Sequence, residues 1–427
     1  MHDIARQLDE QSRRSFISHA AKAALGVSIL PSAGHLLAKS PEAASAATKA
    51  HCDNVIFLYM RGGMSHVDTF DPKTTEVKGM SSPIKTKSPD LKISSLLPKL
   101  AQLGNHLAVV RSMHVRTGAH AEASYAMHTG FSMRPGTSHP HLGPWAQYFQ
   151  GKRKHDLPDS VIVAGGNPGP GFFTPEHSPF PIGDPTKGIR DLLPKIPKYR
   201  FNKRVKLARQ FAESFEYYFP HQDVKAYSDF YDQTIRFFNG KAAEAFDLNK
   251  EPRPMRDRYG VDPFGQGCLL ARRLVENGVR YVEVKFKKNW DVMHRGMTAV
   301  EDLAATLDGP FSELLKDLQS RGMLKRTLVV LATEFGRSPK INQSGGRDHH
   351  PRAFSCVFAG GGVNGGQAIG ATDPKGQGAT GKTYQPKNLH ATMAYALGLP
   401  LDERIHGSGG RPFFVGGQAD PIPGLFS

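Results

Sequence analysis

Thr327-Leu-Val-Val-Leu-Ala332 is a run of strand-forming residues that is followed at once by Thr333-Glu-Phe-Gly-Arg337. A run of this kind, without alternating polar positions, is typical of a strand that is buried on both faces, as in a parallel sheet. Helical spacing precedes it at about 298–320 and follows it at Asn388–Leu397. The stretch therefore predicts a central strand of an α/β fold.

Similar runs lie on both sides of this strand. We expect further strands at 54–60, 106–111, 160–164, 279–286 and 353–359. The alternation of strands and helices predicts a three-layer α/β/α fold, with a mostly parallel sheet between two layers of helices. Residues 201–247 have helical spacing and many aromatic side chains. We interpret them as a helical insertion whose aromatic residues pack in a core.

The first 46 residues have the order of features that is typical of a twin-arginine signal peptide. Arg13-Arg14 precedes an apolar stretch, Ala20–Leu30, and small residues follow at Ala43-Ala44-Ser45-Ala46. We therefore separate a signal peptide, 1–46, from a domain at 47–427. This prediction places the mature protein in the periplasm or outside the cell. No other segment reaches the ~18 apolar residues of a membrane span, so none is expected in the mature chain.

The chain is basic, with 55 Lys and Arg against 39 Asp and Glu, a net charge of +16. Such a charge attracts anions, although a solvated basic surface is an equal alternative. Export argues against nucleic acid as the partner and favours an anionic small-molecule or polysaccharide ester. The three cysteines, Cys52, Cys268 and Cys356, are far apart. We expect no disulfide framework, and Cys268 and Cys356 read as core residues.

Carboxylates and imidazoles follow or precede four of the predicted strands. They are His66, Asp68, Asp291, His294, Glu334, Asp348, His349 and His350. Ligands in such sheets bind beyond the carboxyl ends of the strands, so we expect these side chains to meet at one edge. Carboxylate and imidazole are ligands for divalent metals, here zinc, manganese, iron or calcium. Taken singly, a His beside an Asp is more often a surface ion pair.

Several motifs resemble a known superfamily. Residues 327–337 are similar to the strand and metal loop of the alkaline phosphatase and sulfatase superfamily, and Trp290–His294 to its Asp and His ligand segment. His120–Gly130 resembles the sulfatase nucleophile segment. As a whole, the chain resembles the twin-arginine-exported domain-of-unknown-function family 1501. That resemblance rests on Arg61-Gly-Gly-Met-Ser-His-Val-Asp-Thr-Phe-Asp71, Pro263–Cys268, Thr333–Arg337 and Gly346–Pro351.

The resemblance implies an alkaline phosphatase-like fold and a metal-dependent hydrolase of phosphate or sulfate esters. The sulfatase motif needs Cys or Ser where His120 stands, so no formylglycine can form. Ser124 becomes the candidate nucleophile, with His120 as a further catalytic candidate, Ser65 as a rival, or water instead of a side chain. Arg61 and Arg337 would clamp an anionic group, or form structural ion pairs. The alternative function is a non-catalytic exported binding protein for an anionic glycan or an envelope partner.

Overall fold

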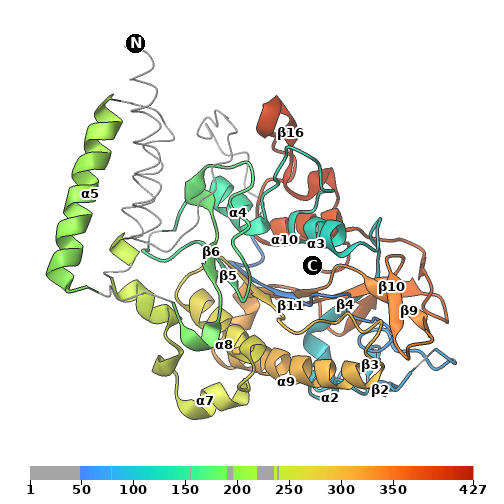
Figure 1. Cartoon of the computed structure of the whole chain (residues 1–427). Coiled ribbons are helices and arrows are strands. Elements are labelled where there is room, and N and C mark those ends of the chain that lie inside the picture. Colours follow the sequence, from blue (N-terminus) through green and yellow to red (C-terminus); the bar gives the residue numbers. More distant parts are fainter. Residues whose placement is uncertain are drawn as a thin grey trace.

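A single eight-stranded sheet runs through the centre of the molecule (Figure 1). The computed structural model describes residues 49–77, 79–153, 155–189, 196–218, 235–237 and 240–426. The strands lie in the order β12-β4-β11-β8-β1-β7-β5-β6. In chain order they are β1 (Asn54–Tyr59), β4 (Leu107–Met113), β5 (Ser160–Val163), β6 (Phe180–Ile182), β7 (Tyr281–Lys285), β8 (Thr327–Ala332), β11 (Phe354–Gly360) and β12 (Gln367–Ile369).

Strand β11 is the exception to the parallel arrangement, because it runs antiparallel to both of its neighbours, β4 and β8. The other neighbouring pairs in the sheet are parallel. The prediction of a mostly parallel sheet is therefore confirmed. The reversal brings the start of β11 to the same edge as the ends of β1, β7 and β8. Edge strands β6 and β12 were not predicted.

Helices cover both faces of the sheet, as the α/β/α prediction requires (Figure 1). Side chains of a buried strand point alternately to its two faces. On β1, Ile56 and Leu58 therefore join one hydrophobic cluster, whereas Val55 and Phe57 join the other. The first cluster includes α2 (Pro98–Ala101), α8 (Pro263–Glu276) and α9 (Thr298–Ser320), and the second includes α3 (His120–Thr129), α4 (Leu142–Gln150) and α10 (Pro386–Ala396).

Local sequence explains where the main helices begin and end. Helix α8 starts with Pro263, and the Asp262 side chain accepts a hydrogen bond from the Phe264 amide at 2.9 Å. Such a cap satisfies a backbone donor that the helix itself leaves free. Gly278 follows α8 with a φ of 96°, the conformation that a helix end favours and glycine tolerates.

Short elements complete the fold. Helix α7 spans Arg253–Arg258. The two-stranded pairs are β2 (Pro83–Lys85) with β3 (Lys92–Ser94), β9 (Gly336–Ile341) with β10 (Arg347–His350), β13 (Ala371–Thr372) with β14 (Ala379–Thr380), and β15 (Ile405–His406) with β16 (Pro412–Phe413). Hairpin β9–β10 lies between β8 and β11 in the chain, so it belongs to the sheet edge where the ligand candidates were expected.

The predicted helical insertion, 201–247, begins with helix α5 (Lys198–Tyr218). Its aromatic residues were expected in a core, and for α5 this was wrong. Phe211 is 64% exposed and Tyr218 74% exposed. Helical spacing of aromatics shows a common face, but it does not show that another element packs on that face. Phe237, in contrast, is buried as predicted. Residues 219–234 and 238–239, and the whole predicted signal peptide, lie outside the described residues.

Two further expectations concern apolar segments and cysteines. Within the described residues, no helix is both long and apolar enough to cross a membrane. The three cysteines are buried and unpaired. Burial raises the pKa of the Cys52 thiol to about 12 and those of Cys268 and Cys356 still further. These thiols are therefore inert core residues, as predicted for Cys268 and Cys356.

Candidate functional site

Helix α3 presents one polar face to the carboxyl end of the sheet. His120, Ser124 and His128 follow one another at intervals of four residues, which places their side chains on the same side of the helix. All three line a cavity of about 460 Å³. Tyr59 at the end of β1 and Lys285 at the end of β7 are neighbours in the sheet and line the same cavity. This cavity lies at the predicted edge.

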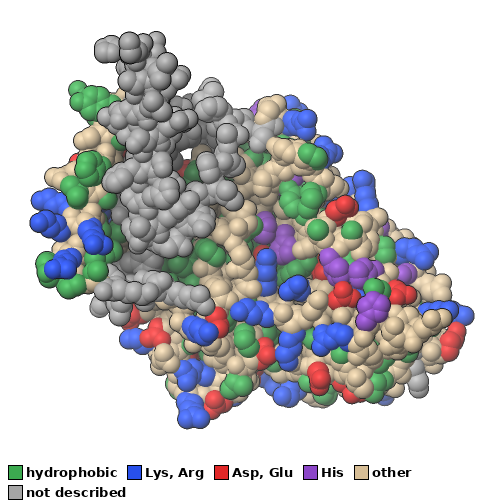
Figure 2. Space-filling view, in the orientation of Figure 1, with side chains coloured by type: hydrophobic (Ala, Val, Ile, Leu, Met, Phe, Trp, Pro, Cys, Tyr) green, Lys and Arg blue, Asp and Glu red, His purple; other side chains and the backbone are tan. Residues whose placement is uncertain are grey.

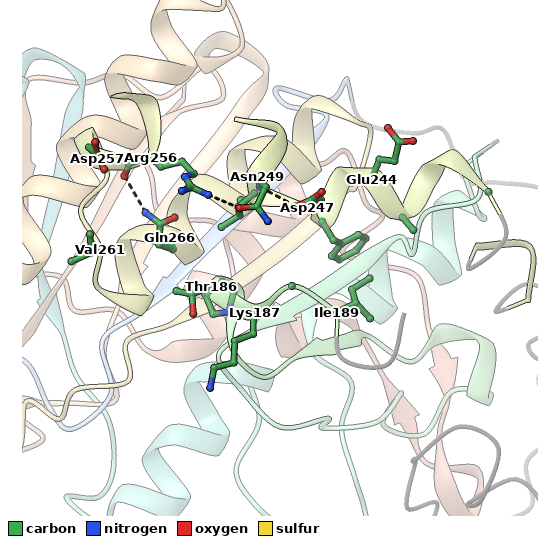
Figure 3. A pocket seen from close by; sticks show the side chains of 16 residues that line it. Thr186, Lys187, Ile189, Glu244, Asp247, Asn249, Arg256, Asp257, Val261 and Gln266 are labelled. Carbon is green, nitrogen blue, oxygen red and sulfur yellow. Dashed lines mark hydrogen bonds between the residues drawn. The ribbon is translucent and has the colours of Figure 1, made fainter. Parts of the chain in front are cut away.

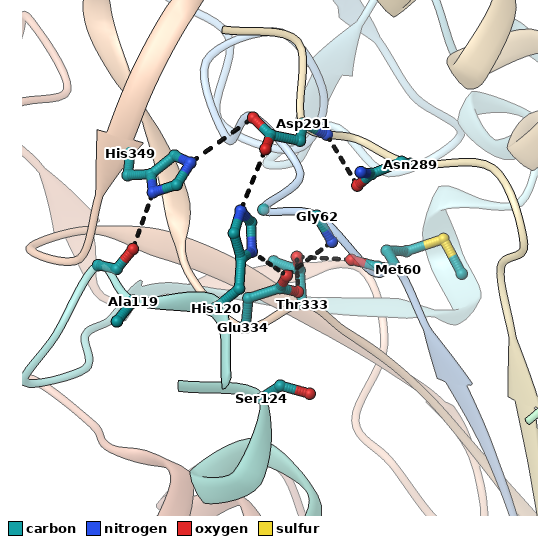
Figure 4. A network of polar contacts seen from close by, with 12 residues as sticks. Met60, Gly62, Ala119, His120, Ser124, Asn289, Asp291, Thr333, Glu334 and His349 are labelled. Atoms are coloured by element: carbon teal, nitrogen blue, oxygen red, sulfur yellow. Dashed lines mark hydrogen bonds and ion pairs between the residues drawn. The ribbon is translucent and has the colours of Figure 1, made fainter. Parts of the chain in front are cut away.

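Three side chains in and beside this cavity form a compact group, His120, Asp291 and His349, whose nearest ligand atoms all lie within 4.8 Å of one another (Figure 4). Nε2 of His120 lies 3.2 Å from Oδ2 of Asp291, and Nε2 of His349 lies 3.6 Å from Oδ1 of the same carboxylate. Asp291 and His349 were predicted as metal ligands. His120 was predicted as a catalytic residue instead.

Both histidines of this group are held by their other ring nitrogen. Nδ1 of His349 lies 2.8 Å from the carbonyl oxygen of Gly118, and Nδ1 of His120 lies 2.8 Å from Oε1 of Glu334. Both partners are acceptors, so each Nδ1 donates to its partner, and each Nε2, which here faces the Asp291 carboxylate, is the nitrogen left for a cation. Second partners of this kind fix the orientation of metal-binding histidines in proteins. The pair is therefore arranged as a cation would require.

Glu334 orients the group rather than belonging to it. Its carboxylate is buried and also accepts hydrogen bonds from the Gly62 amide at 2.7 Å and from the Tyr59 hydroxyl at 3.0 Å. Burial favours a higher pKa for Glu334, but these hydrogen bonds and that of His120 outweigh it and lower the pKa. The hydrogen bond that His120 donates to Glu334 in turn raises the pKa of His120. Glu334 was predicted as a direct metal ligand.

Arg337 is bound within the protein. Its guanidinium lies 2.8 Å from Oδ1 of Asp291, and it donates to the backbone carbonyls of Gly62 and Gly63. The side chain is fully buried. Burial would raise the pKa of Asp291, but Arg337 and the two imidazoles outweigh it and lower that pKa. This arrangement matches the structural ion pair that the sequence left open, and it leaves Arg337 without a free face for a substrate anion.

Glycine at position 62 allows the first loop to approach the Asp291 loop. Gly62 has a φ of 101°, and a Cβ atom there would lie 1.8 Å from Oδ1 of Asn289. Only glycine fits this conformation and this contact. The Trp290 amide then donates to the Arg61 carbonyl at 3.0 Å. The Arg61-Gly62-Gly63 motif thus positions Asp291 through its backbone.

Ser124 faces a second buried pair, which the sequence reasoning did not find. Its Oγ lies 3.4 Å from Nδ1 of His128, and Nε2 of His128 lies 3.0 Å from Oε1 of Glu283. Glu283 is fully buried, and burial alone would raise its pKa. His128, His141 and Lys285 outweigh the burial and hold that pKa well below its usual range. Two signals were available, namely the His-x₃-Ser-x₃-His spacing and a charged residue in a buried strand.

Comparison with known proteins bears on the family of the chain. Residues 52–426 match the model of a protein family of unknown function, DUF1501. The chain belongs to the DUF1501 family. No curated protein sequence matches it.

Two solved structures are similar to this chain over most of its length. A sulfatase from Pseudoalteromonas sp., PsFucS1, is 13% identical, with a TM-score of 0.37, over 82% of this chain and 68% of that chain. The lipoteichoic acid synthase LtaP from Listeria monocytogenes is 9% identical, with a TM-score of 0.37, over 88% of this chain and 84% of that chain. At these scores, neither similarity bears on the activity of this DUF1501 protein.

Several predicted metal ligands lie apart from the group. Asp68 is fully buried and forms a two-point ion pair with Arg347, at 2.8 and 3.1 Å. His66 and His350 stack with ring centres 6.1 Å apart, and each Nε2 contacts a backbone carbonyl, of Gly376 and Gln377 respectively. These contacts give Asp68, His66 and His350 structural partners in this DUF1501 fold.

The remaining candidates are also placed. His294 is exposed on the turn after Asp291, and Asp348 is exposed with Oδ1 accepting from Asn342 at 2.8 Å. Neither belongs to the group of three. Ser65, the rival nucleophile, is buried and donates to Asp68 at 2.5 Å. Arg61 is exposed and lines the cavity, where an anion can reach it. In Figure 2, histidine and acidic side chains gather on this face, with Lys and Arg around them.

A second hollow, of about 580 Å³, lies elsewhere in the molecule (Figure 3). It is lined by Lys187 and Arg256 together with Glu244, Asp247 and Asp257. Its charges are therefore mixed, and its lining includes no histidine. The Arg256 guanidinium is directed to Asn249 of the same wall, at 2.7 Å. Among its described residues the hollow has no metal group, and the Thr186 hydroxyl in its lining donates to Asp184 at 2.7 Å, so the cavity beside α3 is the candidate site of this DUF1501 chain.

Proposed function

We propose that this chain is an exported metal-dependent hydrolase of phosphate or sulfate esters, with Ser124 as its nucleophile. One observation carries the proposal. The cavity beside α3 holds a hydroxyl, Ser124, and is bordered by the imidazole and carboxylate group of His120, Asp291 and His349. The cationic Arg61 and Lys285 line the same space. A hydroxyl and metal ligands are the groups that transfer of an anionic ester needs, and the two cations draw an anionic molecule into the cavity.

The residues present fit a divalent metal. His120, Asp291 and His349 supply two nitrogens and one oxygen, and the Nε2 atom of His349 is buried without a hydrogen bond. Such a mixed set suits zinc, manganese or iron, whereas calcium prefers oxygen ligands alone. A bound ion would polarise the ester and neutralise charge that develops in the transition state. The ligand set thus supports the metal part of the proposal.

The chain itself provides a route for the proton of Ser124. The Tyr59 hydroxyl interacts with the Ser124 side chain and donates to Oε2 of Glu334 at 3.0 Å. Burial, with the charge of Glu334, raises the pKa of Tyr59 well above its usual value, so the phenol stays protonated. As Ser124 Oγ bonds to phosphorus or sulfur, its proton would pass to Tyr59 and the phenolic proton to Glu334.

The ester bond would break in the same step. The leaving oxygen takes the electron pair and is released as the alcohol after protonation by solvent, and water then hydrolyses the ester on Ser124. His128 would keep the hydroxyl in place. Its Nδ1 lies 2.7 Å from the Ser124 carbonyl and 3.4 Å from Oγ, while Glu283 holds the other nitrogen. With an acceptor at each ring nitrogen, His128 serves as a support rather than as the base.

One observation favours the alternative, a non-catalytic binding protein for an anionic glycan or an envelope partner. The guanidinium of Arg337 lies 2.8 Å from Oδ1 of Asp291 and neutralises the negative charge of this carboxylate, which would otherwise attract a metal ion. If this pair keeps metal out, the cavity would still attract anions through Arg61 and Lys285.

Metal analysis separates the two functions. The exported, mature protein should contain near-stoichiometric zinc, manganese or iron, and should release p-nitrophenol from its phosphate or sulfate ester. An Asp291→Ala/His349→Ala variant should lose both the metal and the activity. His294→Ala is the matched control, because His294 is exposed outside the group. A wild-type protein that stays metal-free after incubation with each ion, and hydrolyses neither ester, would favour the binding protein.

A further inference from the structure

We propose that Arg61, Lys285 and Lys287 form a second anion-binding wall of the cavity, so that its substrate is an ester carrying at least two anionic groups, such as a sulfated or phosphorylated oligosaccharide. The inference rests on the proposed function, because it names the class of ester that the same cavity would take. We call these three residues the cationic wall.

The sheet explains why the three cations converge. In the parallel pairing of β1 and β7, Tyr59 is opposite Lys285. Arg61 lies two residues beyond Tyr59, and Lys287 lies two residues beyond Lys285. All four line the cavity. The cationic wall therefore comes from two adjacent strand ends, while Ser124 and His120 reach the cavity from α3.

The acids that line the cavity do not compensate Arg61 and Lys287, whereas Lys285 also balances the buried Glu283. Nζ of Lys285 lies 3.4 Å from Glu283, but that carboxylate also faces His128 at 3.0 Å. The acids that line the cavity, Asp291 and Glu334, are engaged by Arg337 and His120. They leave the positive charges of Arg61 and Lys287 for a ligand.

Two of the three cations also extend into solvent. Arg61 is exposed, and within the described part of the chain it has no ion pair. Lys287 is exposed as well, and its charge reaches Asp184, which is already paired with Lys187 at 3.6 Å. Exposed, weakly paired cations at the mouth of a cavity are available to an incoming anion.

The backbone beside Lys285 is shaped to make room for it. Ala164, which follows β5 and lines the cavity, has a φ of 62°, an unusual value for a residue with a side chain. A Cβ atom on the next residue, Gly165, would lie 2.7 Å from Cδ of Lys285. Strained backbone of this kind persists where the surrounding structure requires it, often at binding sites. The loop after β5 thus leaves space for the Lys285 side chain, which lines the cavity.

The position of the cationic wall indicates more than one anionic group. A single phosphate or sulfate group placed for attack by Ser124 would meet α3 and the group of His120, Asp291 and His349. The wall is carried by other elements, the ends of β1 and β7, and would then remain without a partner. A second anionic group on the same molecule would engage it, and lysine suits this role as a mobile point charge.

Binding to the metal-free protein tests the inference without requiring turnover. The probes are glucose 6-sulfate, which has one anionic group, and a fluorescently labelled heparin-derived hexasaccharide, which has many. The Lys285→Gln/Lys287→Gln variant should bind the hexasaccharide at least about fivefold more weakly, since each exposed pair contributes modestly. Its affinity for glucose 6-sulfate should change by less than about twofold.

Lys288→Gln is the matched control. Lys288 is adjacent in sequence, but its amine bonds to Thr306 at 2.8 Å and lies 3.7 Å from Asp262, away from the cavity. This variant should bind both probes like the wild type. Because Lys285 balances buried Glu283, Lys287→Gln and Arg61→Gln are measured singly as well, so the test does not depend on folding of the double variant.

Two results would overturn the inference. An equal loss in Lys288→Gln would show a general surface charge effect, and an equal loss for glucose 6-sulfate would assign the wall to the group that Ser124 attacks. Failure of the proposed function looks different. In that case no ester is hydrolysed, while the hexasaccharide still depends on the cationic wall. If the protein hydrolyses esters but all the wall variants bind the hexasaccharide like the wild type, the inference about the cationic wall is wrong and the proposed function stands.

Discussion

Oγ of Ser124 lies 3.4 Å from Nδ1 of His128, one helical turn farther along α3. The imidazole cannot turn away, because its other nitrogen lies 3.0 Å from the fully buried Glu283 of β7. Glu283 in the sheet thus holds the imidazole of His128, and His128 in turn holds the hydroxyl of Ser124. A hydroxyl held in this way has little orientational freedom left to lose on reaching a transition state.

The first prediction concerns the nucleophile. Ser124→Ala should lower kcat for p-nitrophenyl ester hydrolysis by about 10³-fold or more, because no other hydroxyl replaces it. Its metal content should not change. Ser65→Ala is the control, since Ser65 is buried against Asp68 and should affect only stability. If Ser65→Ala lost the activity and Ser124→Ala kept it, the assignment would be reversed.

The second prediction concerns the proton route. Tyr59→Phe should lower kcat by about 10²-fold, the lower range for loss of a proton-transfer group, with KM and metal content nearly unchanged. Tyr281→Phe is a matched control, because Tyr281 is also buried and contacts a carboxylate, Glu283, at 3.5 Å, yet does not line the cavity. Equal kcat values for the two variants would show that Tyr59 does not transfer the proton of Ser124.

The third prediction concerns Asp68, which the sequence suggested as a metal ligand. Removing one partner of a buried ion pair leaves the other charge uncompensated, at a cost of about 3–5 kcal/mol. Asp68→Ala should therefore lower the free energy of unfolding by that amount, because Arg347 is fully buried. Metal content per folded protein should remain at the wild-type value. A stable variant that had lost its metal would show that Asp68 is a ligand after all.

The fourth prediction concerns acid stability. His390 is buried in α10, with Nε2 2.9 Å from the Met127 carbonyl of α3, and burial lowers its pKa to about 4. Between pH 6.5, its ordinary pKa, and pH 4, His390 is protonated in the unfolded chain but neutral in the folded chain. The contribution of His390 to the free energy of unfolding is therefore most favourable above pH 6.5, and it falls by about 3 kcal/mol as the pH drops to about 4.

Chemical denaturation at a series of pH values checks this prediction. His390→Gln should lose less stability than the wild type between pH 6.5 and 4, and the exposed His294→Gln should follow the wild type. Buried His66, whose pKa burial also lowers to about 4, should keep part of the dependence in His390→Gln. Parallel curves for the wild type and His390→Gln would contradict the assignment.

The fold was predictable from sequence to a large extent, because buried strands have a strong signature. The run at Thr327–Ala332 coincides with β8, and those at 54–60 and 279–286 contain β1 and β7. The direction of β11 was not predictable. A buried strand is apolar whichever way it runs, so composition gives no sign of its direction.

The candidate site was predictable only in part. The sequence pointed to the correct loops, but adjacent residues such as His349 and His350 have the same chemistry, and only backbone geometry decides which one reaches Asp291. Arg337 illustrates a second limit. The sequence could not tell whether its guanidinium meets a substrate or the carbonyls of its own protein.

The position of β1 has a consequence for the order of events during synthesis. This strand comes first in the sheet, yet its hydrogen-bonded neighbours are β7 and β8 from the distant C-terminal half of the chain. Contacts of such long range form slowly and late. During synthesis, β1 therefore lacks its neighbouring strands until the ribosome has synthesised residues beyond Ala332. A chain with this strand connectivity benefits from an export pathway that transports folded proteins, such as the twin-arginine pathway that we predict from Arg13-Arg14.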